Sequence, residues 1–176
     1  MRRFILPLSL VALLALLLPP VTLSAQITDR ELGDLVVDAV TRYPNFTIFD
    51  DVNIEVDNRN VRLTGRVTTP VKKDDIGKRV AKIDGIRTLT NDIGVLPLSP
   101  YDAELRTRVA RAIYNHPSFW QYASMASPPI HIIVENSHIV LTGRVNSETE
   151  RMLAFSLAHV GGALDVTNRL KLDRER

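Results

Sequence analysis

A five-residue phrase, Leu-Thr-Gly-Arg-Val, occurs twice in the sequence, at residues 63–67 and again at residues 141–145. The copies lie 78 positions apart (141 − 63 = 78), and apolar and polar residues alternate through each copy and the residues before it. This period of two is typical of a β-strand with one buried face. Glycine within a strand permits the close approach of a neighbouring backbone or helix. The repeat therefore predicts two domains of one fold, with Gly65 and Gly143 at equivalent sheet positions beneath a helix.

The residues around the first copy predict the order helix, strand, strand, helix, strand. Thr28 and Glu31 have the spacing of a capping box, and apolar residues at helical spacing follow, so a helix is expected at residues 29–42. Alternating segments on either side of Asn58-Arg59 predict a hairpin that pairs Glu55 with Arg62. A second helix is expected behind Thr69-Pro70, and Gly85 ends it before a strand at residues 89–95.

The same order is predicted around the second copy. Ser99 and Pro100 begin a helix, alternating segments at residues 130–134 and 139–145 predict a hairpin, and Ser147 with Glu150 has capping-box spacing. Gly162, in the pair Gly161-Gly162, ends the last helix as Gly85 does in the first unit. We expect a first domain at residues 27–96, a linker at 97–100 and a second domain at 101–173.

The Leu-x-Gly-x-Val strand, the order of elements and the length of each unit resemble those of the BON domain, the bacterial OsmY and nodulation domain. The predicted fold class is α+β, with two tandem small domains, each α-β-β-α-β with a three-stranded sheet that carries two helices on one face. The resemblance implies a non-enzymatic protein of the periplasm that associates with phospholipid surfaces or the envelope. It also implies a role in envelope integrity and in tolerance of osmotic and other envelope stress.

The N-terminus has the features of a secretory signal peptide, which is expected at residues 1–25. Two arginines precede an apolar run from Phe4 to Leu18, and the run ends before prolines and the small residue Ala25. The run is short for a membrane span, so we expect cleavage after Ala25, export to the periplasm and no integral membrane anchor in the mature chain. The chain contains no cysteine, so it has neither a lipid-attachment cysteine nor disulfides.

Composition argues against nucleic-acid binding and against several kinds of catalytic site. Removing residues 1–25 takes away two arginines and leaves 22 − 2 = 20 basic residues against 20 acidic ones, whereas nucleic-acid binding shows a basic surplus. The four histidines show no metal-ligand spacing, and no nucleophile elbow or phosphate loop is present. We therefore expect that the protein is not an enzyme and that it binds no metal and no cofactor.

The second unit carries an insertion between its first helix and its first strand. The offset between the units is 73 at the first helices (Asp29 and Asp102) and 78 at the glycine phrase, so five residues are added (78 − 73 = 5). The inserted region holds Phe119, Trp120 and Tyr122. Either these aromatic side chains cover the open end of the core, or they form an apolar loop tip that contacts a lipid headgroup layer or a partner protein. We expect Trp120 to be partly exposed.

Two further surfaces are candidates for contact with a partner. Ile133 and Val140 replace the charged pair Glu55 and Arg62 on the outer sheet face, and their expected cover is the first domain, a second copy or an outside partner. Basic side chains also gather on two helices, where they face either solvent or anionic phospholipid; these are Lys72, Lys73, Lys78, Arg79 and Lys82 on one helix, and Arg106, Arg108 and Arg111 on the other.

These features leave two functional hypotheses. The first is an envelope binding module that contacts phospholipid, through the inserted aromatic residues and the basic helix of the second unit. The alternative is a protein-interaction or chaperone-like module that uses the apolar outer sheet face. The sequence does not decide between them, and it does not predict the oligomeric state or the orientation of the two domains.

Overall fold

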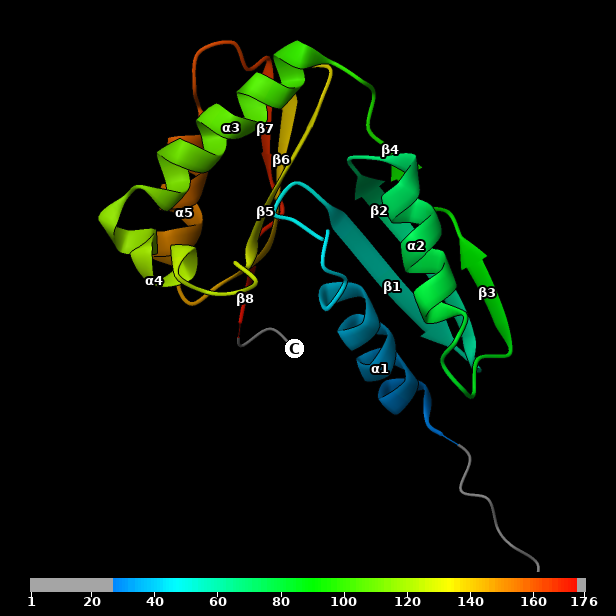
Figure 1. Cartoon of the computed structure of the whole chain (residues 1–176). Helices are drawn as coiled ribbons and strands as arrows, with labels where there is room; N and C mark the ends of the chain where they lie inside the picture. Colours follow the sequence, from blue (N-terminus) through cyan, green and yellow to red (C-terminus); the bar gives the residue numbers. More distant parts are fainter. Residues whose placement is uncertain (1–26, 174–176) are drawn as a thin grey trace, which may run out of the picture.

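The structure is a computed structural model that describes residues 27–173. The expected signal peptide at residues 1–25 and its cleavage site lie outside the described residues. Two α+β domains follow one another along the chain (Figure 1), as the repeat predicts. Within residues 27–173, no helix combines the length and the apolar character needed to cross a membrane.

The first domain has the predicted order of elements. Its elements are α1 (Asp29–Thr41), β1 (Asp51–Asp57), β2 (Asn60–Val67), α2 (Pro70–Val80), β3 (Thr88–Asn91) and β4 (Gly94–Val95). β1 and β2 form an antiparallel hairpin in which Glu55 is opposite Arg62, as predicted. β3 and β4 both pair in parallel with β2. They are two parts of the expected third strand, so the sheet is three strands wide.

The second domain repeats this topology. Its elements are α3 (Pro100–Tyr114), the short 3₁₀ helix η1 (Pro117–Phe119), α4 (Trp120–Ala123), β5 (Ile130–Glu135), β6 (His138–Val145), α5 (Glu148–Ala158), β7 (Asp165–Asn168) and β8 (Lys171–Leu172). β5 and β6 form the hairpin, and β7 and β8 pair in parallel with β6. In each domain the two long helices pack on one face of the sheet, over a core built from the inward side chains of the strands.

An asparagine lies where the third strand of each sheet is interrupted, at the same place in both domains. The Asn91 amide donates a hydrogen bond to the Lys73 carbonyl, and its side-chain oxygen accepts one from the Ile93 N–H. Asn168 makes the equivalent bonds to Arg151 and Leu170. The side chain therefore satisfies backbone groups where the ladder of sheet hydrogen bonds is broken, and it connects the third strand to the second helix.

An aspartate at the start of the first helix holds the hairpin turn in each domain. Residues 58–59 and 136–137 all have positive φ, as in a type I′ turn. The Asp29 carboxylate accepts hydrogen bonds from both backbone N–H groups of the first turn, at 2.7 and 2.8 Å. Asp102, which is 2% exposed, does the same for the second turn at 3.0 and 2.9 Å. Asp29 and Asp102, which match in the sequence, therefore have the same role of stabilising the hairpin turn.

The repeated glycines lie at equivalent sheet positions, but the group that approaches them is not a helix. Gly65 and Gly143 have φ of 113° and 100°, a conformation that side chains with a Cβ rarely adopt. A Cβ on Gly65 would overlap the carbonyl oxygen of Asp51, and one on Gly143 would overlap that of Pro129. The close neighbour of each glycine is therefore the backbone at the start of the paired strand, which is the group that requires glycine there. Gly85 and Gly162 also have positive φ, but they are not the helix stops expected of them. α2 ends at Val80 with Ala81 as its C-cap and α5 ends at Ala158 with His159 as its C-cap, so the glycines lie in the turns that follow.

Residues 46–50 of the first domain contact β5 of the second. The Ile132 N–H donates a hydrogen bond to the Ile48 carbonyl (2.7 Å), and Nδ1 of His131 lies 2.6 Å from the Asp50 carbonyl oxygen. Ile48 and Phe49 also pack against the core of the second domain. The segment therefore covers part of the free edge of β5, an edge that would otherwise present unpaired backbone groups.

Candidate functional site

The inserted region has an inner face and an outer face. Phe119 and Tyr122 are 0% and 4% exposed and belong to the core, so neither is available to a partner at the surface, which corrects their assignment as contact residues. Trp120 is 63% exposed and Met125 is 41% exposed. Both alternatives for the insertion therefore apply, each to different side chains, because in the short helical turns Phe119 and Tyr122, three residues apart, share one face while Trp120 lies on another.

Trp120 lies directly beyond the C-terminal end of α3. Its indole N–H donates a hydrogen bond to the Asn115 carbonyl at 3.2 Å, and the Asn115 N–H donates to the Arg111 carbonyl at 3.1 Å. The indole is therefore held by its polar edge about one turn from Arg111, while most of its ring faces solvent. Arg111 is itself exposed, and its side chain has no ion-pair partner within residues 27–173.

Arg106 is buried, which corrects its assignment as a surface contact. It is 8% exposed, and its Nη2 donates a hydrogen bond to the Val134 carbonyl at 2.7 Å. Burial lowers the pKa of Arg106, and the negative charge of Asp102 opposes this shift. Every fourth residue of α3 faces the sheet, and Arg106 follows Asp102 at this spacing. The helical period alone could have placed Arg106 inward.

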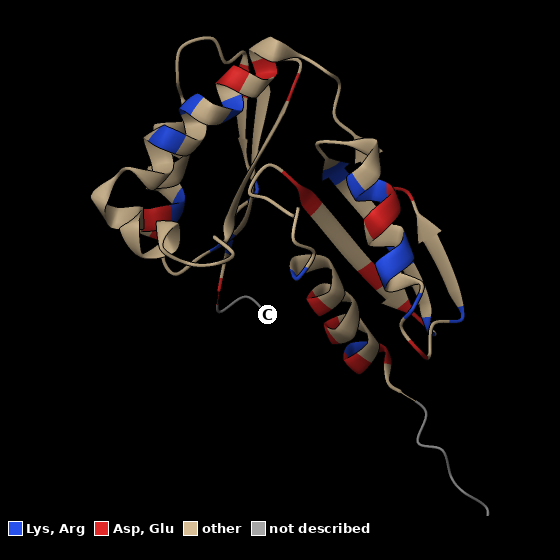
Figure 2. Cartoon of the chain, viewed as in Figure 1, with Lys and Arg blue, Asp and Glu red and all other residues tan. Residues whose placement is uncertain are grey.

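Arg108 is partly exposed on α3. Its Nε lies 3.9 Å from a carboxylate oxygen of Glu104, one turn earlier. Figure 2 shows that the helix carries acidic residues near its start and basic residues further along. This order suits the helix dipole, which favours negative charge at the N-terminus and positive charge at the C-terminus. Arg108 and Arg111 are thus the two basic residues of α3 that reach solvent.

The basic residues of α2 are partly used within the first domain. Lys72 pairs with Asp50, and these side chains are 12% and 0% exposed. Hydrogen bonds from Lys72, Thr47 and Thr68 outweigh the effect of burial and lower the pKa of Asp50. Arg79 donates to the Ala39 carbonyl at 3.1 Å. The α2 cluster therefore offers fewer free cations than its sequence suggests.

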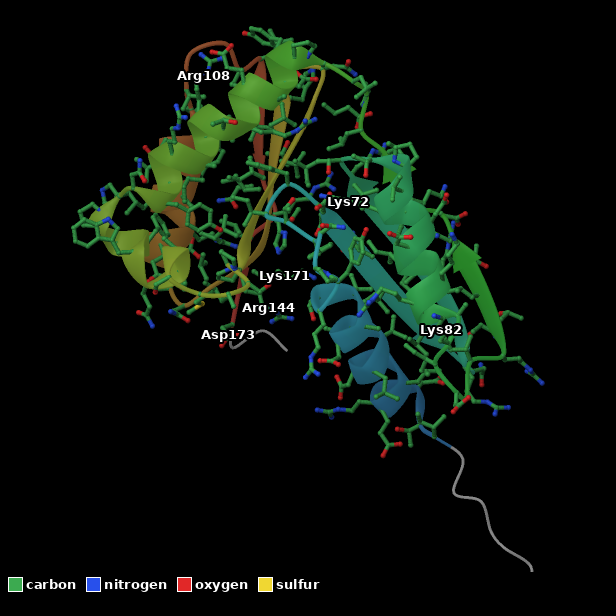
Figure 3. The ribbon with its side chains drawn as sticks, viewed as in Figure 1. Lys72, Lys82, Arg108, Arg144, Lys171 and Asp173 are labelled. Carbon is green, nitrogen blue, oxygen red and sulfur yellow. The ribbon has the colours of Figure 1, made fainter. Side chains whose placement is uncertain are left out.

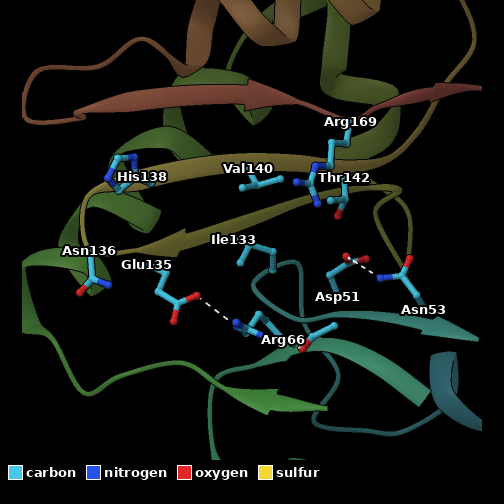
Figure 4. Close-up of a pocket in the computed structure, with 11 residues that line it drawn as sticks. Asp51, Asn53, Arg66, Ile133, Glu135, Asn136, His138, Val140, Thr142 and Arg169 are labelled. Atoms are coloured by element: carbon cyan, nitrogen blue, oxygen red, sulfur yellow. Dashed lines mark hydrogen bonds and ion pairs between the residues drawn. The ribbon is translucent and has the colours of Figure 1, made fainter. Parts of the chain in front are cut away.

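Ile133 and Val140 line a cleft between the two domains, of about 440 Å³ (Figure 4). Ile133 is 7% exposed and points toward the first domain. At the edge of the cleft Arg66 pairs with Glu135 at 3.1 Å. The outer face of the second sheet therefore meets the first domain, which was the first of the covers considered for it.

Two features escaped the sequence analysis. One is a largely apolar groove of about 400 Å³ beside α3, whose lining residues include Ile48, Phe49, Ala110, Arg111, Tyr114 and Pro128. The other is a group of basic side chains on the outer face of the second sheet, Arg144, Arg169 and Lys171. Strand alternation places these three side chains on one face of the sheet. It does not show which residues of the first domain lie opposite them, because those residues are distant in the sequence. Within residues 27–173, no group of three or more His, Asp or Glu side chains could hold a metal ion.

A known domain family matches both units of this architecture. The sequence profile of the BON domain matches residues 27–97 and 101–174. No curated protein sequence matches the chain. Two solved structures of CdsD, a structural protein of the type III secretion system of Chlamydia trachomatis, are similar at 15% and 16% identity with TM-scores of 0.34 and 0.32. Each alignment covers 83% of this chain, and 67% and 64% of the CdsD chains.

BON domains are generally binding modules rather than enzymes, and the proteins that carry them are associated with the periplasm or the envelope. BON domains are also known to bind phospholipids. The matches cover most of the chain and coincide with the two repeated α+β units of the structure. The chain therefore belongs to the BON-domain family and contains two BON domains in tandem.

Proposed function

We propose that this protein is a non-enzymatic binding protein of the bacterial periplasm that contacts anionic phospholipid surfaces and supports envelope integrity under osmotic and related stress. The contact surface consists of Arg108, Arg111, Trp120 and Met125 in the second domain. The observation that carries the proposal is the exposed Trp120 ring, held by its hydrogen bond to Asn115 at the C-terminal end of α3, one helical turn beyond the exposed Arg111.

This arrangement suits the boundary between water and a lipid bilayer. Tryptophan favours the headgroup layer, because its ring is apolar and its N–H is polar. An arginine near an anionic membrane surface contributes about 1 kcal/mol of attraction. The surface is small, so it favours reversible attachment to the membrane face. The buried side chains Phe119, Tyr122 and Arg106 support this surface from below and do not belong to it.

The alternative, a protein-interaction or chaperone-like module, was based on an apolar outer sheet face. That face offers little exposed apolar area in the two-domain chain, because Ile133 is 7% exposed and turned toward the first domain. The apolar groove beside α3 is the surface that remains for this alternative. Binding of an unfolded apolar peptide there, with no effect of lipid vesicles, would favour it over the membrane proposal.

Vesicle flotation tests the proposal directly. The protein is expected to float with vesicles that contain phosphatidylglycerol and to stay behind with phosphatidylcholine alone, and the Trp120 fluorescence is expected to shift to the blue on binding. Trp120→Ala and Arg111→Gln should each weaken flotation several-fold at unchanged thermal stability. The matched controls are Leu164→Ala, which removes an apolar side chain that is 74% exposed on another loop, and Lys82→Gln in the first domain. Equal loss of flotation in the variants and controls would contradict the proposed surface.

A further inference from the structure

The cleft between the domains contains basic side chains that the membrane proposal does not use. A second cavity of about 500 Å³ adjoins the one shown in Figure 4, and the two share Asp51, Asn53, Thr142 and Arg169. The second cavity is also lined by Arg144 and Lys171. Figure 3 shows Arg144 and Lys171 at the end of the second sheet that lies near α1. Together the two cavities have the size of a small-molecule site.

Three cations of the second cavity, Arg144, Arg169 and Lys171, lie on one face of the second sheet. Arg144 on β6 is the register partner of Lys171 on β8, and Arg169 lies just before β8 on the same outer face. Within residues 27–173, none of the three side chains makes an ion pair. Their charges therefore remain available to an anion from solution.

The first domain shows what a neutralised version of this face looks like. Asp92 follows Asn91 as Arg169 follows Asn168, and Asp92 pairs with Arg62 at 2.8 Å. In the second domain these two positions hold Arg169 and Val140, so the acidic partner is replaced by a cation. The change places a cation where the first domain has a neutralised pair, on a sheet face that borders the interdomain cleft.

An unsatisfied hydroxyl marks the middle of the cleft. Thr142 Oγ1 is buried and has no hydrogen-bond partner within the described residues. Its residue lines both cavities, and Figure 4 shows its side chain beside the Arg169 guanidinium. A buried polar atom without a partner costs free energy, so a rotation of this side chain toward a ligand group in the cleft would be favoured by the bond that it completes.

We propose that this cleft binds a phosphate monoester carried on a small hydroxylated molecule, such as a sugar phosphate. Arg144, Arg169 and Lys171 hold the phosphate, with Thr142 as a further donor. The second cavity carries three cations and one carboxylate, Asp51, a formal charge of +2 that matches the dianion (3 − 1 = 2). Arginine suits phosphate because its planar group donates two parallel hydrogen bonds.

The body of the ligand lies in the first cavity. That cavity contains the neutral ion pair of Arg66 with Glu135, together with Asn53, Asn136 and His138. Its amide and imidazole groups offer hydrogen bonds to hydroxyl groups. The arrangement therefore selects a polar, uncharged body next to a charged phosphate. This inference does not rest on membrane binding, since it uses a different surface.

Nuclear magnetic resonance titration of the protein with glucose 6-phosphate tests this site at constant ionic strength. The expected result is a saturable shift of the amide resonances of Thr142, Arg144 and Lys171, with a weaker effect of inorganic phosphate and none of glucose. Arg169→Gln should weaken binding about tenfold, as expected for loss of one charge-assisted contact. Lys171→Gln should also weaken it, while Lys82→Gln on the first domain should leave it unchanged.

Three results would overturn the proposal. They are no saturable shift with the sugar phosphate, equal binding by Arg169→Gln when that variant keeps the thermal stability of the natural protein, and shifts that sodium chloride reproduces. Vesicles of phosphatidylglycerol separate the two sources of phosphate. If vesicle binding depended on Arg169 while the soluble ester did not bind, the cleft would be a lipid headgroup site and the soluble ligand would be excluded. Loss of vesicle binding in Trp120→Ala with an intact sugar-phosphate titration would leave this inference standing.

Discussion

The same backbone N–H group finds different acceptors in the two domains, and the helix residue beside it has the opposite charge, Lys72 in the first domain and Glu150 in the second. The Thr68 N–H donates to the Asp50 carboxylate at 2.8 Å, and Lys72 neutralises that carboxylate. In the second domain the equivalent Asn146 N–H donates to Tyr122 Oη and to the Glu150 carboxylate, at 3.0 and 2.9 Å. Burial and the hydrogen bond to Glu150 raise the pKa of Tyr122 to about 12. The fold therefore requires an acceptor at this point, and the charge of the helix residue follows from which acceptor is present.

Asp50→Asn is expected to destabilise the protein by about 3 kcal/mol at pH 7, because Lys72 would lose its partner in a buried pair. The difference from the natural protein should shrink with acid. The pKa of Asp50 is lowered in the folded state from 3.8, so its contribution is complete above pH 3.8 and is lost as the pH falls through the lower folded value. Urea unfolding of both proteins between neutral and acidic pH measures this.

Asp51→Asn is the matched control, since the Asp51 carboxylate has only a 3.5 Å hydrogen bond to Asn53. It should change the free energy of unfolding by about 0.5 kcal/mol or less at any pH. If Asp50→Asn were as mild as this control, the buried pair would contribute nothing to the fold.

Gly143→Val is expected to destabilise the second domain by about 3 kcal/mol or more. Two costs add, since valine is strained at a φ of 100° and its Cβ would overlap the Pro129 carbonyl oxygen. Gly161→Ala is the control, because Gly161 has open space around it. Thermal unfolding of both variants gives the comparison, and similar melting temperatures would show that the repeated glycine is not required.

At the scale of elements, the inserted turn of η1 and α4 is amphipathic over only a few residues. Phe119 fills the core below it and Trp120 stands above it, and a 3₁₀ turn followed directly by an α-helical turn produces this contrast. The insertion therefore extends the core of the second domain and at the same time adds an exposed aromatic surface that the first domain lacks.

Phe119→Ala should lower the free energy of unfolding by about 3 to 5 kcal/mol, as expected for a fully buried phenylalanine. Trp120→Ala should change it by about 0.5 kcal/mol or less, because most of the indole faces solvent. Chemical unfolding of the two variants side by side measures both. A large loss of stability in Trp120→Ala would assign its ring to packing and remove the main support for the membrane surface.

At the scale of the whole molecule, the domains are joined by more than their linker. The backbone hydrogen bond from Ile132 to Ile48, the contact of His131 with Asp50 and the Arg66–Glu135 pair connect residues that are distant in the sequence. The Lys72–Asp50 pair holds the segment at residues 46–50 in place from the first domain. The two domains therefore move together as long as this segment keeps its conformation.

Replacing Ile48 and Phe49 together by alanine should loosen this junction. The Ile132 amide, which donates across the junction, is expected to exchange with solvent at least tenfold faster, because the packing that holds its acceptor is lost. The Asp92 amide, which donates to Leu63 within the first domain at 2.8 Å, serves as the control and should change little. Hydrogen exchange measures both amides in one sample, and equal exchange rates in variant and natural protein would show that the junction is held by other contacts.

The sequence by itself determined the two α+β units, the order of their elements, the register of the hairpins and the start of each long helix. These features depend on residues close together in the chain, such as Thr28 with Glu31 or Glu55 with Arg62, so periodicity and capping rules identify them. Because the sequence contains two similar units, each assignment is supported by matching residues in both. An error at this level was the assignment of Gly85 and Gly162 as helix stops, since both second helices end a few residues before these glycines.

Only the tertiary structure decided which side chains of the second domain are free to bind. Phe119 and Trp120 are adjacent in the chain, but the first fills the core and the second faces solvent. Ile133 is covered by a domain that the sequence could not orient. The physical reason is that exposure depends on contacts between segments as distant as Asp50 and His131, which are 81 residues apart, and local patterns carry no information about such contacts.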